Sequence, residues 1–361
     1  MTEKRRRIMA KKRVTLPKNF DELIEAGDVE DLKAVYEKCE LSAHSGRYSL
    51  NTALHYGDIP EELVIWLVER GLDVNTVNYY GRTPLYTHAT LGSDTVKLLF
   101  KLGGDIKKPD NYGNTPLHTA AEFFHPATVK FLLEKGADID IKNDMGRTPM
   151  DCTLAVCRNI NIAQAAEVSE MLIEAGAEIT PEMAERVQLI GKDFEFHREN
   201  FNKDYLAETE AGLDKLYELF DVNPAPKRKI HDGVSPIIVK ECPWKEQYDQ
   251  LWDMLIPSRG AAKTVQGEVI RITGRVRDEL YRNGGVNWDK DYRNMLNALP
   301  KYFASGIPLA EKELEETKQL VSSIRTKGDE EVITERLCEL AVIWVLLNQT
   351  PISLERTNYN R

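Results

Sequence analysis

A short phrase recurs at nearly constant spacing through the first half of the chain. Its copies are NTALH from Asn51, GRTPLY from Gly81, GNTPLH from Gly113 and GRTPM from Gly146. Their threonines stand 31, 32 and 33 residues apart. A second landmark keeps the same phase, with GLDV, GGDI, GADI and GAEI at positions 71, 103, 136 and 176. A period of this length indicates a repeat architecture, in which each unit buries its apolar face only against its neighbours.

Each landmark has a local structural reason. Thr followed by Pro is a helix start, because the hydroxyl caps a free amide and Pro takes the first helical position without losing a donor. The apolar residues of TVKLLFKLGG and ATVKFLLEKGA recur every three to four positions and then meet Gly, which suits a helix C-terminus. The polar stretch between each Gly and the next Thr suits a tight turn. The pattern therefore predicts two helices and a projecting turn in each unit.

A unit of about 33 residues with the phrase T-P-L-H-x-A resembles the ankyrin repeat. The stretch TPLHTA at 115–120 matches that phrase letter for letter. We expect five units, at 19–49, 50–80, 81–112, 113–145 and 146–180. The first lacks Thr-Pro and resembles a terminal cap, and the second has Ala53 where Pro is expected. The last carries a seven-residue insertion near CRNINIAQ, which we expect to form a loop.

The resemblance implies a curved array that binds a partner protein along its concave side, where the turn tips and first helices lie. The partner-binding residues expected there are Tyr79, Tyr80, Arg82, Tyr86, Asn111, Tyr112, Asn114, Glu122, Phe123, Phe124, Met145 and Arg147. Tyr, Phe, Met and Arg are enriched at interface cores and hot spots. In the alternative interpretation, the phenylalanines pack on the neighbouring repeat and the tyrosines are incidental surface. His118 lies within the family phrase, which implies a structural bond to backbone between repeats.

Beyond residue 180 the repeat is lost, but helical spacing continues. Residues 181–222 predict two or three helices that cap the array, and the proline-rich stretch 223–242 predicts a linker with a short strand at PIIVK. A C-terminal domain over 243–361 follows, with helices predicted at 244–256, 261–282, 289–304, 308–326 and 328–348. The fold class is therefore all-α: an ankyrin-repeat solenoid of about five helix-turn-helix units, followed by a helical domain.

The C-terminal domain contains one unusual stretch, TVQGEVIRITGRVRDELYRNGGVNWDKDY. On a helix, Glu268, Arg271 and Arg275 share a face. Gly267 and Gly274 would each cost about 1 kcal/mol relative to Ala unless backbones approach closely there. Three interpretations remain open: a buried ion-pair network, a partner- or anion-binding face, and a catalytic cleft. The candidate residues of a functional face are Glu268, Arg271, Arg275, Trp288 and Asp289. The QGE…NGG.NWD pattern is similar to regions that trail other bacterial ankyrin proteins.

Charge divides the chain unevenly. The net charge is -10, but residues 1–13 hold seven basic residues against Glu3, so the rest of the chain sums to -16. We expect residues 1–18 to form a flexible basic tail. An acidic remainder argues against nucleic acid as the main ligand, because that affinity rests on phosphate neutralisation. No apolar run approaches the roughly 18 residues that a membrane span needs, so a cytoplasmic protein is expected.

The leading hypothesis is a protein-protein interaction protein, acting as an inhibitor, an adaptor or an immunity or anti-defence factor. A homo-oligomer through the C-terminal domain would be a further contact. The chain has no P-loop and no G-x-S-x-G elbow, and its five cysteines are scattered, so neither a catalytic residue, nor a metal, nor a cofactor is expected. The alternatives are an enzyme in residues 243–361 with Glu268 as acid or base, and nucleic-acid binding through the basic tail.

Overall fold

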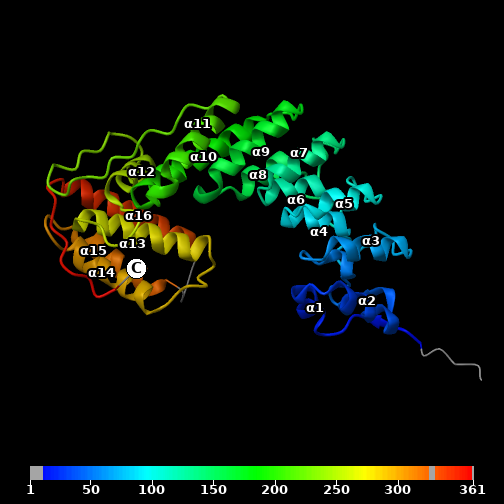
Figure 1. Cartoon of the computed structure of the whole chain (residues 1–361). Helices are drawn as coiled ribbons and strands as arrows, with labels where there is room; N and C mark the ends of the chain where they lie inside the picture. Colours follow the sequence, from blue (N-terminus) through cyan, green and yellow to red (C-terminus); the bar gives the residue numbers. More distant parts are fainter. Residues whose placement is uncertain (1–10, 325–329, 360–361) are drawn as a thin grey trace, which may run out of the picture. The chain divides into compact units, whose positions relative to one another are not determined.

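The computed structural model describes residues 11–324 and 330–359, which are mostly helical (Figure 1). The chain divides into two compact units. The first consists of the residues up to Asp193 together with Asn202–Ala225, and the second of Phe194–Phe201 together with Pro226–Arg361.

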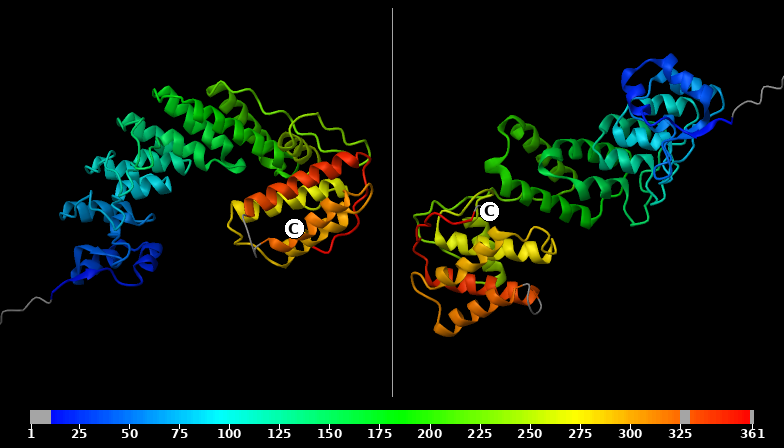
Figure 2. Two further views of the ribbon diagram at one scale, coloured as in Figure 1. Left: turned by 180° about the vertical axis from the view of Figure 1, so that it is seen from behind. Right: turned by 90° about the horizontal axis from the view of Figure 1, so that it is seen from below.

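The first unit is a stack of short helices that follow one another in chain order (Figures 1 and 2). Its elements are β1 (Arg13–Thr15), α1 (Phe20–Ala26), α2 (Val29–Lys38), β2 (Cys39–His44), the 3₁₀ turn η1 (Ala53–His55), α3 (Glu61–Glu69), α4 (Pro84–Leu91), α5 (Thr95–Lys101), α6 (Pro116–Glu122), α7 (Pro126–Glu134), α8 (Pro149–Val156), η2 (Asn159–Asn161), α9 (Ile162–Glu174), α10 (Pro181–His197) and α11 (Lys203–Leu219). The last turn of α10 belongs to the second unit.

The helix starts follow from the Thr-Pro landmarks. The hydroxyls of Thr83 and Thr148 accept hydrogen bonds from amides three residues ahead, at 3.1 and 3.2 Å, and Pro occupies the first turn of α4, α6 and α8. Gly103 and Gly136 follow α5 and α7 with φ of 98° and 82°, a left-handed conformation that favours glycine. The predicted helix boundaries in these three repeats are therefore confirmed.

The N-terminal end departs from the prediction. Strands β1 and β2 pair in parallel, so the expectation of a flexible tail over residues 1–18 is wrong for Arg13–Thr15; residues 1–10 lie outside the described residues. The same pairing gives the first predicted unit a strand after its two helices. In the second predicted repeat (residues 50–80), where Ala53 replaces Pro, the first helix is reduced to the single turn η1.

The insertion in the last repeat is not a free loop, which corrects the prediction. It forms η2 and the start of α9, and α11 packs against both. The approach is close, because a Cβ added to Gly212 in α11 would lie 2.6 Å from Cα of Ala163. Helix α10 contacts the same repeat at α8, where the Arg186 guanidinium donates to the backbone carbonyls of Leu154 (3.0 Å) and Ala155 (2.9 Å).

The second unit is a helical bundle around α13. Its elements are η3 (Arg198–Asn200), α12 (Trp244–Leu255), α13 (Val265–Tyr281), α14 (Lys290–Phe303), α15 (Glu311–Ser323) and α16 (Glu330–Leu347). Helices α12, α14 and α16 pack on α13, and α15 covers α14 and α16 (Figures 1 and 2). Tyr248, Phe303 and Trp344 are buried in the core. Across the described residues, no helix combines the length and the hydropathy required of a membrane span.

The strand predicted at PIIVK is absent. Ile237 is fully buried in the core of the second unit, and its amide donates to the carbonyl of Gln349 at 2.8 Å, but Ile238 is 74% exposed. One backbone hydrogen bond does not make a ladder, so the segment is not a strand.

Candidate functional site

The projecting turns of the repeats are each built on one Asn or Asp side chain. Oδ1 of Asn78 accepts hydrogen bonds from the amides of Tyr80 (3.0 Å) and Arg82 (3.1 Å). Asp110 and Asn143 accept the equivalent pairs of bonds in the next two turns, at 2.9 to 3.0 Å. Because a short polar side chain closes each turn onto its own backbone, the residues between the two amides are pushed outward.

Neighbouring turns are also joined to one another through the backbone. The bonds run from Tyr79 N to Ser49 O (2.8 Å), from Asn111 N to Tyr80 O (2.9 Å) and from Asp144 N to Tyr112 O (3.0 Å). Each turn is thereby fixed against the next, so their side chains are presented as one row on a stiff support.

That row is apolar and exposed. We name it the tip row, and it consists of Tyr48, Tyr79, Tyr80, Tyr112 and Met145. These side chains are between 41% and 79% exposed. The rings of Tyr79 and Tyr80 meet edge to face, with centroids 5.4 Å apart. Large apolar side chains that are held in a row and left uncovered are typical of a protein-binding surface.

Sequence reasoning missed Tyr48. Aligned on the repeat threonine, Tyr48 stands four residues before Thr52, as Tyr79 stands four residues before Thr83. The same spacing from the repeat threonine that gave Tyr79 would have found it. The Arg47 guanidinium carbon lies 5.4 Å from the centroid of the Tyr48 ring.

Tyr86 was predicted as a surface contact, and this prediction is wrong. Its side chain is 3% exposed, and its hydroxyl donates to Oδ2 of Asp110 at 3.1 Å. Burial raises the pKa of Tyr86, so the phenol remains the donor. Arg82 is engaged with the same pair, since its Nε lies 3.4 Å from that oxygen and its guanidinium carbon 5.2 Å from the Tyr86 ring centroid.

Of the predicted residues at the end of α6, Phe123 and Phe124 lie in a turn beyond the helix, whereas Glu122 is the last residue of the helix. Phe123 is the C-cap of α6 and is 53% exposed. Phe124 follows with φ of 58°, a left-handed conformation rare for a bulky residue, and is half-buried. Glu122 is half-buried in the last turn of α6, and burial raises its pKa.

The remaining predicted residues divide between support and surface. Asn114 supports the array, because its Oδ1 accepts a 2.8 Å bond from Nδ2 of Asn143 in the next turn. Asn111 is exposed and donates its side-chain amide to the Tyr79 carbonyl at 3.2 Å. Arg147 is exposed at the rim of a pocket.

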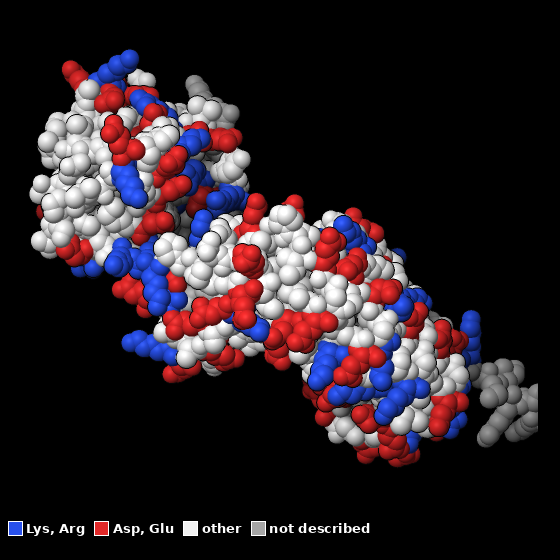
Figure 3. Space-filling model, turned by 90° about the horizontal axis from the view of Figure 1, so that it is seen from above, with Lys and Arg blue, Asp and Glu red and all other residues white. Residues whose placement is uncertain are grey.

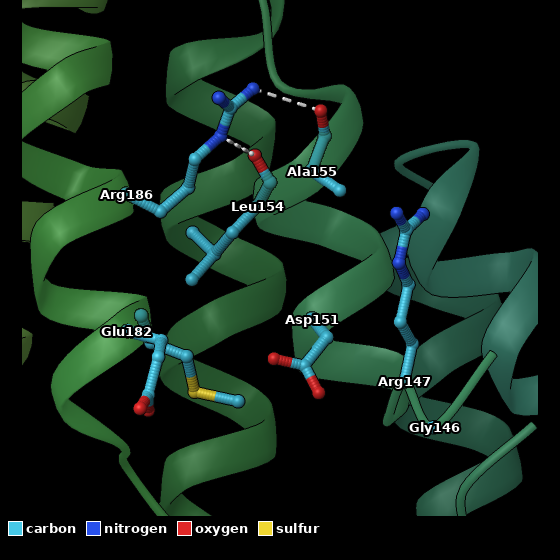
Figure 4. A pocket seen from close by; sticks show the side chains of 8 residues that line it. Gly146, Arg147, Asp151, Leu154, Ala155, Glu182 and Arg186 are labelled. Carbon is cyan, nitrogen blue, oxygen red and sulfur yellow. Dashed lines mark hydrogen bonds between the residues drawn. The ribbon is translucent and has the colours of Figure 1, made fainter.

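This pocket has a volume of about 430 Å³ and lies where the last projecting turn, α8 and α10 meet (Figure 4). Its lining residues are Gly146, Arg147, Asp151, Leu154, Ala155, Glu182, Met183 and Arg186. Leu154 and Met183 are buried and provide its apolar part. No residue of α10 was among the predicted site residues, because the repeat pattern ends before that helix.

Three histidines in the array, His55, His88 and His118, contact backbone carbonyls; Nε2 of His88 lies 3.1 Å from the Leu54 oxygen. The amides of Thr52 and Thr115 donate to Nδ1 of His55 and His118, which leaves the proton on Nε2 to bond the carbonyls of Arg82 and Arg147, both at 3.0 Å. The bond to backbone expected for His118 is therefore present. Burial lowers the pKa of His55 to about 4, so it is neutral at pH 7.

In the second unit, Glu268 and Arg271 form an ion pair whose side chains are both 0% exposed. Nε of Arg271 lies 2.8 Å from Oε2 of Glu268, and Nη2 lies 2.6 Å from Oε1. Oε1 also accepts from the Tyr359 hydroxyl at 2.8 Å, and Oε2 from the Ala262 amide at 3.2 Å. A general acid or base has to reach its substrate, and this carboxylate faces protein on every side, so the geometry supports the ion-pair network over the catalytic cleft.

The two glycines of the same helix allow close packing, as the sequence interpretation required. A Cβ at Gly267 would meet Cβ of Ala262 at 2.8 Å, and one at Gly274 would overlap the Trp252 ring. Gln266, next to Gly267, holds the C-terminal segment, with Nε2 donating to the carbonyls of Asn348 and Thr350, both at 2.8 Å.

Trp288 and Asp289 of the candidate C-terminal face, and the nearby Glu279, also make structural contacts. Glu279 organises the NGG loop, accepting the Asn287 amide at 2.5 Å. Trp288 stacks on Tyr292, with centroids 5.5 Å apart, and Asp289 caps α14. Arg275 is half-buried on α13, two turns beyond Glu268. Glu279 was not among the predicted site residues.

Charged side chains of both signs are scattered over the surface seen in Figure 3, and acidic ones gather over the middle of the first unit. The charge there is consistent with the acidic balance of the chain beyond its first 13 residues.

The first unit is thus a helical-repeat solenoid with a presented row of turn tips, a class of protein whose surfaces serve binding. Its family follows from comparison: the model of ankyrin repeats in three copies matches residues 50–143 and 92–182. Residues 50–182 are therefore an ankyrin-repeat array. No family model matches the C-terminal half, and no curated protein matches the chain.

Proposed function

We propose that this protein binds a partner protein through the tip row of its ankyrin array. Ankyrin repeats support a role in protein-protein interaction in general. The observation that carries the more specific proposal is the fixed presentation of exposed tyrosines, since a pre-ordered aromatic side chain loses little conformational entropy on binding.

Because Tyr86 is buried, it is not one of the residues that we propose to contact the partner. The binding residues we now propose are the tip row with Asn111, Phe123 and Arg147. Arg82, Tyr86 and Asn114 hold these residues in place from below. Phe123 aligns with Leu91 eight residues after the repeat threonine, and both are 53% exposed, which extends the apolar surface from the turns to the ends of the first helices.

The described residues of the second unit give no observation that favours catalysis. Glu268 and Arg271 of its candidate face are paired with each other, Trp288 stacks on Tyr292, and Asp289 caps α14. We therefore propose that it acts on, or adds contacts to, a partner that the array holds, as an inhibitor, an adaptor or an immunity factor would. All five cysteines are free, which suits a reducing compartment, and we propose the cytoplasm as the location.

The test is co-precipitation from a lysate of the native host with the full chain and with a Tyr79→Ala/Tyr112→Ala variant. The matched control is Tyr205→Ala/Tyr281→Ala, which removes two exposed tyrosines outside the tip row. We expect the unmodified chain and the control to retain the same partner protein. The tip variant should bind it about 30-fold more weakly, because each of the two tyrosines contributes about 1 kcal/mol of binding free energy. Equal retention by the tip variant would place the binding surface elsewhere.

A further inference from the structure

We propose that the pocket between α8 and α10 receives a lysine or arginine side chain of the partner protein. The inference rests on the proposed function, because the pocket opens beside the last projecting turn, where Gly146 and Arg147 follow Met145 of the tip row. A partner lying on the tip row therefore reaches the pocket without leaving the array.

The pocket matches the two parts of a basic side chain. Its volume of about 430 Å³ falls within the roughly 300 to 1,000 Å³ of ligand pockets. Leu154 and Met183 offer apolar surface to the alkyl stem of such a side chain. Asp151 from α8 and Glu182 from α10 lie at one end, as Figure 4 shows, where they would receive the cationic head.

The two carboxylates have acceptor capacity for that head group. Oδ2 of Asp151 accepts from the Thr148 amide (2.9 Å) and hydroxyl (3.0 Å), while Oδ1 has no hydrogen bond among the described residues. Glu182 is exposed in the first turn of α10, and a bond from its own backbone amide lowers its pKa, so it carries a charge at neutral pH.

Two guanidinium groups, of Arg147 and Arg186, also line the pocket, but they are poorly placed to bind an anion. Nε and Nη2 of Arg186, the two-pronged edge that would grip a carboxylate, are already donated to the carbonyls of Leu154 and Ala155. Its charge is also offset by the C-terminal end of the α8 dipole. Arg147 remains as a single exposed cation at the rim.

The test uses the full chain with ¹³C-labelled methionine methyl groups, because Met183 lines the pocket and reports on its filling. The probes are blocked pentapeptides of four glycines around a central Arg, Lys, Gln or Glu, titrated at millimolar concentration. We expect saturable shifts of the Met183 methyl resonance with the Arg and Lys peptides and none with the Gln peptide. An Asp151→Asn/Glu182→Gln variant should weaken the Arg peptide at least about tenfold, consistent with the loss of two charge-assisted contacts.

Asp151→Asn keeps an acceptor for Thr148, so the variant should remain folded, and an unchanged methyl spectrum without peptide checks this. Equal shifts with the Gln peptide, no shift with Arg and Lys, or a shift with the Glu peptide would each overturn the proposal. The Tyr79→Ala/Tyr112→Ala variant should bind the Arg peptide like the unmodified chain, so failure here is distinct from failure of the tip row.

Discussion

The Tyr86 hydroxyl lies 3.1 Å from Oδ2 of Asp110, and both side chains are buried between two successive repeats. Tyr86 occupies the position that His55 and His118 hold in the neighbouring repeats. Asp110 likewise replaces the turn-closing asparagine found at Asn78 and Asn143. In this repeat, the bond between Tyr86 and Asp110 therefore takes the place of the bond that His55 and His118 make to a backbone carbonyl.

We therefore expect Tyr86→Phe to destabilise the array. The substitution leaves a buried carboxylate short of a donor, which costs about 1 to 3 kcal/mol. Urea unfolding followed by circular dichroism measures the effect. Tyr112→Phe, which removes an exposed hydroxyl, is the matched control and should leave the midpoint unchanged. A Tyr86→Phe midpoint equal to that of the control would show that the pair contributes nothing.

The array should lose stability as the pH falls from 6.5 to about 4. Burial lowers the pKa of His55 and of His88 from 6.5 to about 4, so in this window the unfolded chain binds protons that the folded chain does not. At pH 5.5 each histidine should cost roughly 1.4 kcal/mol relative to pH 7.5. Thermal unfolding at these pH values tests this, and a transition that does not move between pH 7.5 and 5.5 would contradict it.

Gly274→Ala should destabilise the second unit, although alanine is the better helix former. A Cβ there would overlap Trp252 and come within 2.8 Å of the Tyr248 hydroxyl. Overpacking of this kind costs typically 1 to 3 kcal/mol, more than the roughly 1 kcal/mol gained in helix propensity. Asn297→Ala, on an exposed position of α14, is the control and should be neutral or stabilising in the same calorimetric measurement. A higher melting temperature for Gly274→Ala would mean that α12 and α13 are not closely packed.

Gln266→Ala should release the C-terminal segment from α13. The side chain satisfies the carbonyls of Asn348 and Thr350 and the amide of Ile352, so its loss leaves three backbone groups without this partner. We expect hydrogen exchange to accelerate in the peptide that contains residues 349–359. Gln247→Ala, whose side chain bonds one exposed carbonyl at 3.3 Å, should change nothing there. Unchanged exchange in the Gln266→Ala segment would show that other contacts hold it.

The sequence predicted the repeat architecture well because its landmarks act locally. A Thr-Pro start and a left-handed Gly end are decided within one turn, so α4, α6 and α8 begin where expected. In the second unit, α12 and α14 lie within one residue of their predicted ends. Such features need no knowledge of distant contacts.

Features that depend on contacts between residues far apart in the chain could not be predicted from the sequence. The strand β1 exists because β2, some 25 residues away, offers it an edge, and three residues carry too little pattern to show this. Tyr86 was placed on the surface because its partner Asp110 belongs to the next repeat. The pocket was missed since α10 contributes Glu182 and Arg186 from outside the repeat pattern.

The tip row is proposed to bind the partner protein. Hydrogen exchange of the full chain, alone and in complex with the protein recovered by co-precipitation, tests it most directly. We expect slower exchange in peptides covering the three turns at residues 78–82, 110–114 and 143–147, because a bound partner covers their amides. Protection confined to the second unit, with these turns unchanged, would contradict it.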